Sequence, residues 1–123
     1  RWQDRNKKAL FELVCPPGAT LIVPERHIAF LVAWATGAAV ALRPERVPAA
    51  QRYRLLPLYF TRAGSGLDRA LTAARAEPGL IPPLGVHPTH ANGLVLVAEP
   101  TWTWLVDHVP AGERARLVAW PTI

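Results

Sequence analysis

The sequence contains no methionine, a single cysteine and only two lysines among its 14 basic residues. Because Cys15 has no second cysteine to pair with, no disulfide forms within the chain, which favours a reducing, cytoplasmic location. Pro16 and Pro17 follow Cys15, so the thiol does not lie at a helix N-terminus of the kind that activates cysteines. We therefore expect a buried, inert thiol. The start at Arg1 without a methionine suggests a module of a larger protein.

Long hydrophobic runs are also missing. The longest strongly apolar stretch, residues 28–42, is shorter than the roughly 20 residues that cross a bilayer, and Thr36 and Gly37 interrupt it. Residues 1–8 are basic but lead into only a short apolar stretch, unlike a signal peptide. We expect no membrane insertion.

Hydrophobic residues make up 50% of the chain and charged residues 19%, a composition typical of folded domains. A length of 123 residues fits one domain. The surest element is a helix over 66–77. Ser65 can cap it, Asp68 stands at the N3 position of a capping box, and Pro78-Gly79 ends it.

Short segments rich in β-branched, aromatic or other apolar residues predict the strands. They fall at 19–23, 52–61, 94–99 and 114–120. Pro57 predicts an edge position or a bulge, and Thr101 caps a predicted helix at 101–108. The segment 28–34 is apolar on every side, so a helix and a strand both stay open. We expect one α+β domain (1–123) with a mostly antiparallel or mixed sheet of about four to six strands and two or three short helices.

Two segments share a pattern at identical spacing. Val23-Pro24 precedes Leu31-Val32-Ala33-Trp34, and Val109-Pro110 precedes Leu117-Val118-Ala119-Trp120. A duplicated unit and a shared set of apolar residue types both explain the match. If the two segments were structurally equivalent, the strand interpretation of 28–34 would gain, because 114–120 is typical of a strand.

The formal net charge of +5 is concentrated in the middle of the chain. Between residues 43 and 75, Glu45 and Asp68 stand against seven arginines, which accounts for the whole net charge. These are Arg43, Arg46, Arg52, Arg54, Arg62, Arg69 and Arg75. A localised basic face attracts polyanions, so we predict that these arginines contact an acidic partner.

The same segment interleaves arginines with Tyr53 and Tyr59, a mixture that suits nucleic acid because guanidinium groups bind phosphates and rings stack on bases. In a strand, however, Arg52 and Arg54 share one face and Tyr53 takes the other. Tyr53 is therefore expected in the core. Nucleic acid is the second candidate partner, after protein.

Gly64, Ser65 and Gly66 form a candidate anion-binding loop, because glycines before a helix leave backbone N–H groups available to an anion. Asp68 opposes this interpretation, since a carboxylate in the first turn already complements the helix dipole. A plain capped helix start is the alternative.

Trp102 and Trp104 are candidate interface aromatics. Two residues apart on a helix, their rings point in different directions, so at least one is expected to reach the surface, where tryptophan marks protein interfaces. Packing of both rings in the core is the alternative.

His87 and His90 are candidate metal ligands, with Asp107 and His108 as further donors. Pro88 lies between the two histidines and restrains the backbone. The alternative is a rigid, exposed loop with incidental histidines.

The motifs Gly-x-Ser-x-Gly, His-Glu-x-x-His and Gly-x-Gly-x-x-Gly do not occur. We therefore expect a non-catalytic interaction or assembly domain without a cofactor, whose arginine face contacts an acidic partner protein or supports self-association. A nucleic-acid-binding accessory domain is the first alternative. A small metal-dependent hydrolase using His87 and His90 is the second.

Overall fold

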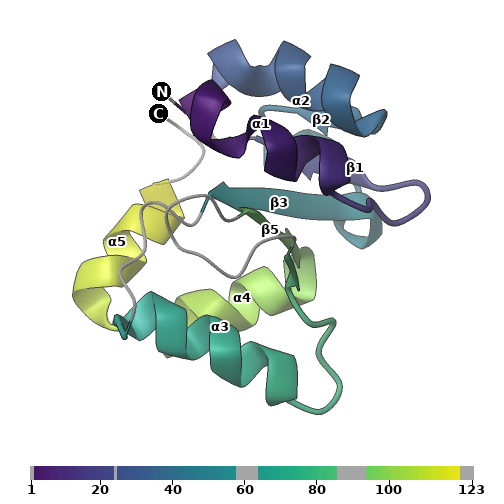
Figure 1. Ribbon diagram of the computed structural model, residues 1–123. Helices are drawn as coiled ribbons and strands as arrows, with labels where there is room; N and C mark the ends of the chain where they lie inside the picture. The colour runs from purple at the N-terminus through teal and green to yellow at the C-terminus, as the bar shows by residue number, and fades with distance from the viewer. Residues whose placement is uncertain (1, 24, 58–63, 86–93, 120–123) are drawn as a thin grey trace.

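The computed structural model describes residues 2–23, 25–57, 64–85 and 94–119 (Figure 1). Its α-helices, within these ranges, are α1 (Trp2–Glu12), α2 (Ala29–Thr36), α3 (Gly66–Ala76), α4 (Glu99–His108) and α5 (Ala111–Ala119). Its strands are β1 (Thr20–Ile22), β2 (Ala39–Ala41), β3 (Arg52–Pro57), β4 (Leu84–Gly85) and β5 (Leu94–Ala98). Three short 3-10 helices, η1 (Arg26–Ile28), η2 (Pro44–Arg46) and η3 (Ala49–Gln51), lie in the connections.

The five strands form one mixed sheet in the order β2-β1-β3-β5-β4. Strand β1 pairs in parallel with β2 and β3, whereas β5 pairs antiparallel with β3 and β4. The predicted α+β class with a mixed sheet is confirmed.

Successive strand side chains alternate between the two faces of the sheet, and each face is covered by its own layer of helices (Figure 1). Helices α1 and α2 cover one face, and α3, α4 and α5 cover the other. The first core therefore joins strand residues such as Leu21 and Leu55 to Leu10 and Val32 of the helices. The second joins strand and helix residues that include Ile22, Leu56, Val97, Leu71 and Leu105.

The segment 28–34, which the sequence left open, is helical. Ile28 ends η1, and α2 then runs to Gly37, whose positive φ of 69° closes the helix in the left-handed region. The parallel pairing of β1 with β2 explains this outcome, because two parallel neighbours need a crossover connection and cannot form a tight hairpin. Helix α2 is that crossover.

The predicted final strand at 114–120 is wrong: helix α5 occupies 111–119. It starts directly after Pro110, whose carbonyl accepts hydrogen bonds from the backbone N–H groups of Glu113 and Arg114. The apolar part of the repeated pattern is therefore helical at both places, since Leu117 lies in α5 as Leu31 lies in α2. The strand that we expected at 114–120 gives no support to a strand at 28–34. With α1, these two helices raise the number above the predicted two or three.

Pro57 does not mark an edge strand, because β3 lies at the centre of the sheet. It closes β3 opposite Leu94 of β5, whereas β1 pairs only as far along β3 as Arg54. The proline is tolerated because it lies beyond the short strand β1.

The helix predicted at 66–77 is confirmed as α3. The Ser65 hydroxyl accepts a hydrogen bond from the Asp68 backbone N–H at 3.2 Å, and an Asp68 carboxylate oxygen accepts one from the Gly64 N–H at 2.7 Å. Helix α4 starts earlier than predicted, with Ala98 as its N-cap. Thr101 lies inside its first turn, where the buried hydroxyl donates to the Ile81 carbonyl.

Candidate interaction surface

The outer side of the α1–α2 layer is apolar and exposed to solvent. Phe30 is 83% exposed, Trp34 63%, Phe11 48%, and Val14, just after α1, 82%. We call these four residues the aromatic face. Exposed apolar side chains that cluster, as opposed to scattered ones, mark interaction sites.

The composition of α2 explains this exposure. Its sequence, Ala-Phe-Leu-Val-Ala-Trp-Ala-Thr, is apolar on every side. Val32 points into the core at 0% exposure, so Phe30 and Trp34, about half a turn away in either direction, point to solvent. Helices that are apolar all round are normally buried on all sides. Here one side of α2 has no cover among the described residues.

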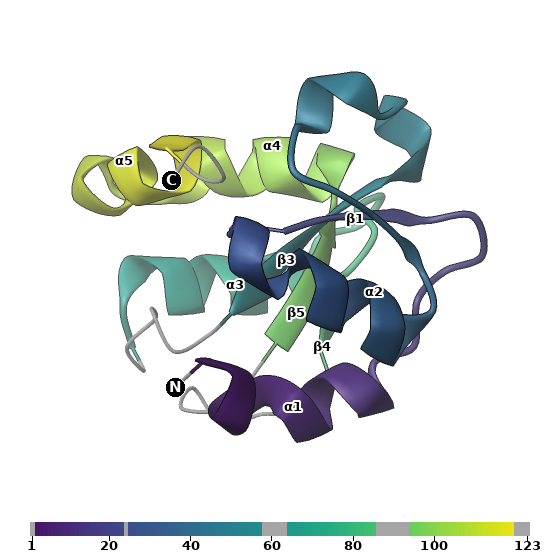
Figure 2. The same cartoon turned by 90° about the horizontal axis from the view of Figure 1, so that it is seen from above.

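Helices α1 and α2 lie side by side over the sheet (Figure 2). The rings of Phe11 and Trp34 meet edge to face, with centroids 5.2 Å apart and an interplanar angle of 84°. Both residues lie in the last turns of their helices, so the C-terminal ends of α1 and α2 are adjacent. The aromatic face is therefore one patch built from two helices.

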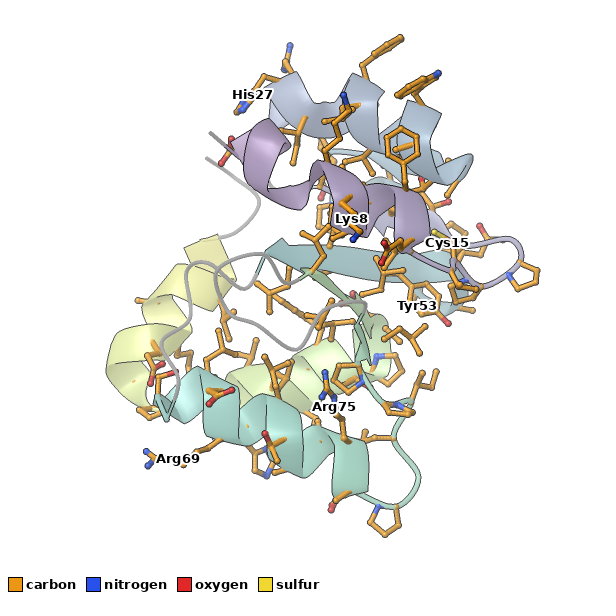
Figure 3. The ribbon with its side chains drawn as sticks, viewed as in Figure 1. Lys8, Cys15, His27, Tyr53, Arg69 and Arg75 are labelled. Carbon is orange, nitrogen blue, oxygen red and sulfur yellow. The ribbon has the colours of Figure 1, made fainter. Side chains whose placement is uncertain are left out.

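Basic side chains occur on the N-terminal half of the same layer. Lys7, Lys8 and Arg26 are exposed. His27, in η1 just before α2, pairs with Glu25 through its Nε2 atom at 3.0 Å from a carboxylate oxygen. Figure 3 shows Lys8 and His27 on this layer, on the side of the sheet away from α3. On this layer the exposed cations thus precede the aromatic rings along the chain, and Lys8 lies 4.0 Å from the Glu12 carboxylate.

Beside Val14, the layer continues into a mostly apolar groove of about 640 Å³. The turn after α1 forms one wall and the segment at β4 the other, with Val14, Cys15, Pro17, Pro83, Leu84 and Gly85 among the lining residues. An apolar surface therefore extends from the helices to the edge of the sheet.

Cys15 lies at this groove and is partly buried. Burial raises the pKa of the Cys15 thiol above its ordinary value, and a hydrogen bond with the Thr36 side chain acts in the opposite direction. A raised pKa keeps the sulfur protonated at neutral pH, which disfavours nucleophilic chemistry. This direction agrees with the expected inert thiol.

Two of the seven predicted binding arginines turn inward. Arg52 Nη1 lies 3.2 Å from Glu99 Oε1, and Arg54 contacts both Glu99 oxygens at 3.4 Å. The guanidinium of Arg54 also stacks on Trp102, 4.6 Å from the ring centroid, while Arg52 donates to the Val47 carbonyl. The predicted shared strand face of Arg52 and Arg54 is correct, but it faces Glu99 of α4.

The other predicted arginines that the structure describes lie on two different elements. Arg43 and Arg46 are exposed around η2. Arg69 and Arg75 are exposed on α3 and point in different directions (Figure 3). Arg62 lies outside the described residues. Tyr53 packs partly buried on the opposite sheet face, among the residues that α1 and α2 cover, as predicted.

The candidate anion loop is filled by the protein's own carboxylates. Besides the contacts of Ser65 and Asp68, the Leu67 N–H donates to Glu113 Oε1 of α5 at 3.1 Å. A side chain at Gly66 would collide with Pro110 and Glu113. These glycines therefore serve the helix start and its packing on α5, and the amides of Gly64, Leu67 and Asp68 already have acceptors.

Trp102 and Trp104 differ, as their spacing on one helix predicts. Trp102 is 5% exposed and belongs to the core. Trp104 is partly exposed and stacks on His108 with centroids 3.9 Å apart. His108 Nδ1 lies 2.7 Å from the Trp104 carbonyl. Of these two tryptophans, only Trp104 stays available as an interface residue.

His87 and His90 lie outside the described residues. Within the residues that are described, no group of three or more His, Cys, Asp or Glu side chains could hold a metal ion. In the same part of the chain no helix has the length and apolar character needed to cross a membrane.

The aromatic face was missed because apolar residues were assigned to the core by default. The signal was nevertheless present: a short helix can bury only one side against a sheet, so an all-apolar helix at 29–36 must expose large side chains.

No protein-family model, curated protein or solved structure matches this chain.

Proposed function

We propose that this protein is a non-catalytic interaction domain that docks an acidic partner protein through the aromatic face. The observation that carries the proposal is the exposure of Phe30 and Trp34 on a helix whose side chains are apolar all round. Large aromatic residues dominate the binding energy of protein interfaces. This proposal moves the contact from the arginines of 43–75, where the sequence placed it, to α1 and α2.

Charge supports an acidic partner. Lys7, Lys8 and Arg26 are exposed on the layer that bears the aromatic face. Charges around an apolar contact set the approach rate and exclude like-charged partners. The partly buried, protonated Cys15 beside the face is compatible with a reducing, cytoplasmic setting.

A photo-reactive benzoylphenylalanine in place of Phe30 tests this function in the host cell. We expect one covalent adduct of discrete mass after irradiation, whose yield falls when Lys8→Glu is added. The matched control places the same group at Ile81, an exposed apolar residue in the connection between α3 and β4. Equal adducts at both positions, or none at position 30, would contradict the proposal.

A further inference from the structure

The spacing of the exposed rings suits a helix as the occupant of the aromatic face. Phe30 and Trp34 are four residues apart, so they stand one above the other, about one helical turn or roughly 6 Å along α2. Phe11 of α1 meets Trp34 from the side. Rows of side chains at this repeat pack into the grooves between the rows of another helix.

An extended partner segment would find little to bind here. A strand that adds to a protein gains affinity mainly through main-chain hydrogen bonds to an open sheet edge. The aromatic face is instead the outer side of two helices, whose backbone groups are bonded within the helices. Side-chain packing is therefore the available source of affinity.

The charges give the occupant a direction. Phe11 and Trp34 lie in the last turns of α1 and α2, whereas Arg26 precedes the first turn of α2. Lys7 and Lys8 lie one turn before Phe11. A partner helix with carboxylates at one end and apolar residues along one side would match both ends of the face.

A second copy of this chain matches less well. It would bring the same exposed basic residues, Lys7, Lys8 and Arg26, to the contact. Like charges at an interface oppose association.

We propose that the aromatic face binds an amphipathic helix of the acidic partner, with the helix lying across α1 and α2 and its carboxylates beside Lys7, Lys8 and Arg26. This inference rests on the proposed function and adds the form and the orientation of the ligand. The groove at Val14 accepts a further apolar side chain from the uncharged end of that helix.

A random peptide library displayed on phage tests the inference without knowledge of the partner. The library is selected on the wild-type domain and depleted on the Phe30→Ser/Trp34→Ser double variant. We expect enriched peptides with apolar residues at i, i+3 or i+4, and i+7, and acidic residues clustered at one end. Synthetic peptides should become helical on binding, by circular dichroism, and bind the double variant at least about tenfold more weakly.

Control variants separate packing from charge. Ile81→Ser removes an exposed apolar residue elsewhere and should leave peptide affinity unchanged. Lys8→Glu should weaken the enriched peptides several-fold, whereas Arg69→Glu, on the other helical layer, should not. Equal effects of the two charge reversals would overturn the proposed orientation.

Other outcomes distinguish this inference from the proposed function. Enriched peptides with alternating apolar residues that bind as strands would overturn the helical partner and leave the protein-docking function standing. Concentration-dependent dimerisation abolished by the double variant would overturn both the helical partner and the acidic partner of the proposed function. Binding to vesicles of phosphatidylcholine and phosphatidylserine that requires Phe30 and Trp34, without peptide enrichment, would overturn both proposals in favour of a lipid surface.

Discussion

The two helical layers of this protein differ in the side chains that they expose to solvent. In the layer of α3, α4 and α5, charged groups pair with neighbours inside the fold: Glu99 binds Arg52 and Arg54, and Glu113 of α5 caps α3. In the layer of α1 and α2, large apolar side chains project into solvent. Both layers bury a complete core against the same sheet. The difference therefore concerns what lies on the outer side of each layer, and it is the basis for the proposal that α1 and α2 bind a partner.

The largest effect is expected from breaking the arginine–glutamate cluster. The side chains of Arg52, Arg54 and Glu99 are 17%, 10% and 18% exposed, so Glu99→Gln leaves two largely buried guanidinium groups beside a neutral amide. Removal of one partner from a buried ion pair costs several kcal/mol, and we expect about 3 kcal/mol of unfolding free energy because some water contact remains. Urea denaturation measures this loss.

The matched control is Lys8→Gln in the other layer. Lys8 and Glu12 are 4.0 Å apart, and the Lys8 side chain is 82% exposed. Exposed ion pairs contribute little, so the change should stay within about 0.5 kcal/mol. Similar losses in the two variants would show that Glu99 is as well solvated as a surface residue, and the contrast between the layers would be lost.

The sequence revealed most about elements whose signals are local. Ser65 and Asp68 fixed the start of α3 because capping depends on residues within one turn. The strand prediction for 114–120 was wrong because the apolar residues there fit the period of a helix as well as that of a strand. Packing against α4 decides between the two.

The candidate site was harder to predict because it depends on long-range contacts. Arg54 and Glu99 are 45 positions apart in sequence, and nothing local announces that they pair. A count of arginines therefore overstated the exposed basic face. The all-apolar sequence of 29–36 indicates that some large side chains are exposed, but the position of α2 on the sheet determines that Phe30 is one of them.

The next effect tests how tightly α3 is locked to α5. A Cβ at Gly66 would lie 2.6 Å from Pro110 Cγ and closer still to Pro110 Cδ and Glu113 Oε2. Gly66→Ala should therefore cost about 2 kcal/mol through overpacking. Gly112→Ala is the control: nothing lies within 4 Å of its Cβ, and alanine should stabilise α5 by about 0.5–1 kcal/mol. Thermal melts that move in the same direction would contradict the interlocked arrangement.

Substitutions at two positions on α2 compare the buried side of the α1–α2 layer directly with its exposed side. Val32 is 0% exposed, so Val32→Ala should cost about 2 kcal/mol through lost packing. Phe30 is mostly in water, and Phe30→Ala should change the free energy of unfolding by no more than about 0.5 kcal/mol. A large loss of unfolding free energy for Phe30→Ala, measured by urea denaturation, would mean that the aromatic face stabilises the fold. That result would contradict its proposed role in binding a partner.

The smallest expected effect is on the pH dependence of folding stability, through Cys15 at the edge of the α1–α2 layer. Because burial raises the pKa of its thiol, the folded protein holds the proton to higher pH than the unfolded chain does. Folding stability should therefore be unaffected at neutral pH and decrease as the pH rises from the thiol pKa of the unfolded chain through that of the folded state.

As the sole cysteine, Cys15 can be followed by its reaction with iodoacetamide across pH, in buffer and in 8 M urea, a concentration of roughly the order that unfolds small domains. The midpoint should lie higher in buffer. Thr36→Val should move it higher still, because the opposing hydrogen bond is lost. A folded midpoint at or below the unfolded one would show that solvent reaches the sulfur freely, and that the groove beside Val14 is less closed than its apolar walls imply.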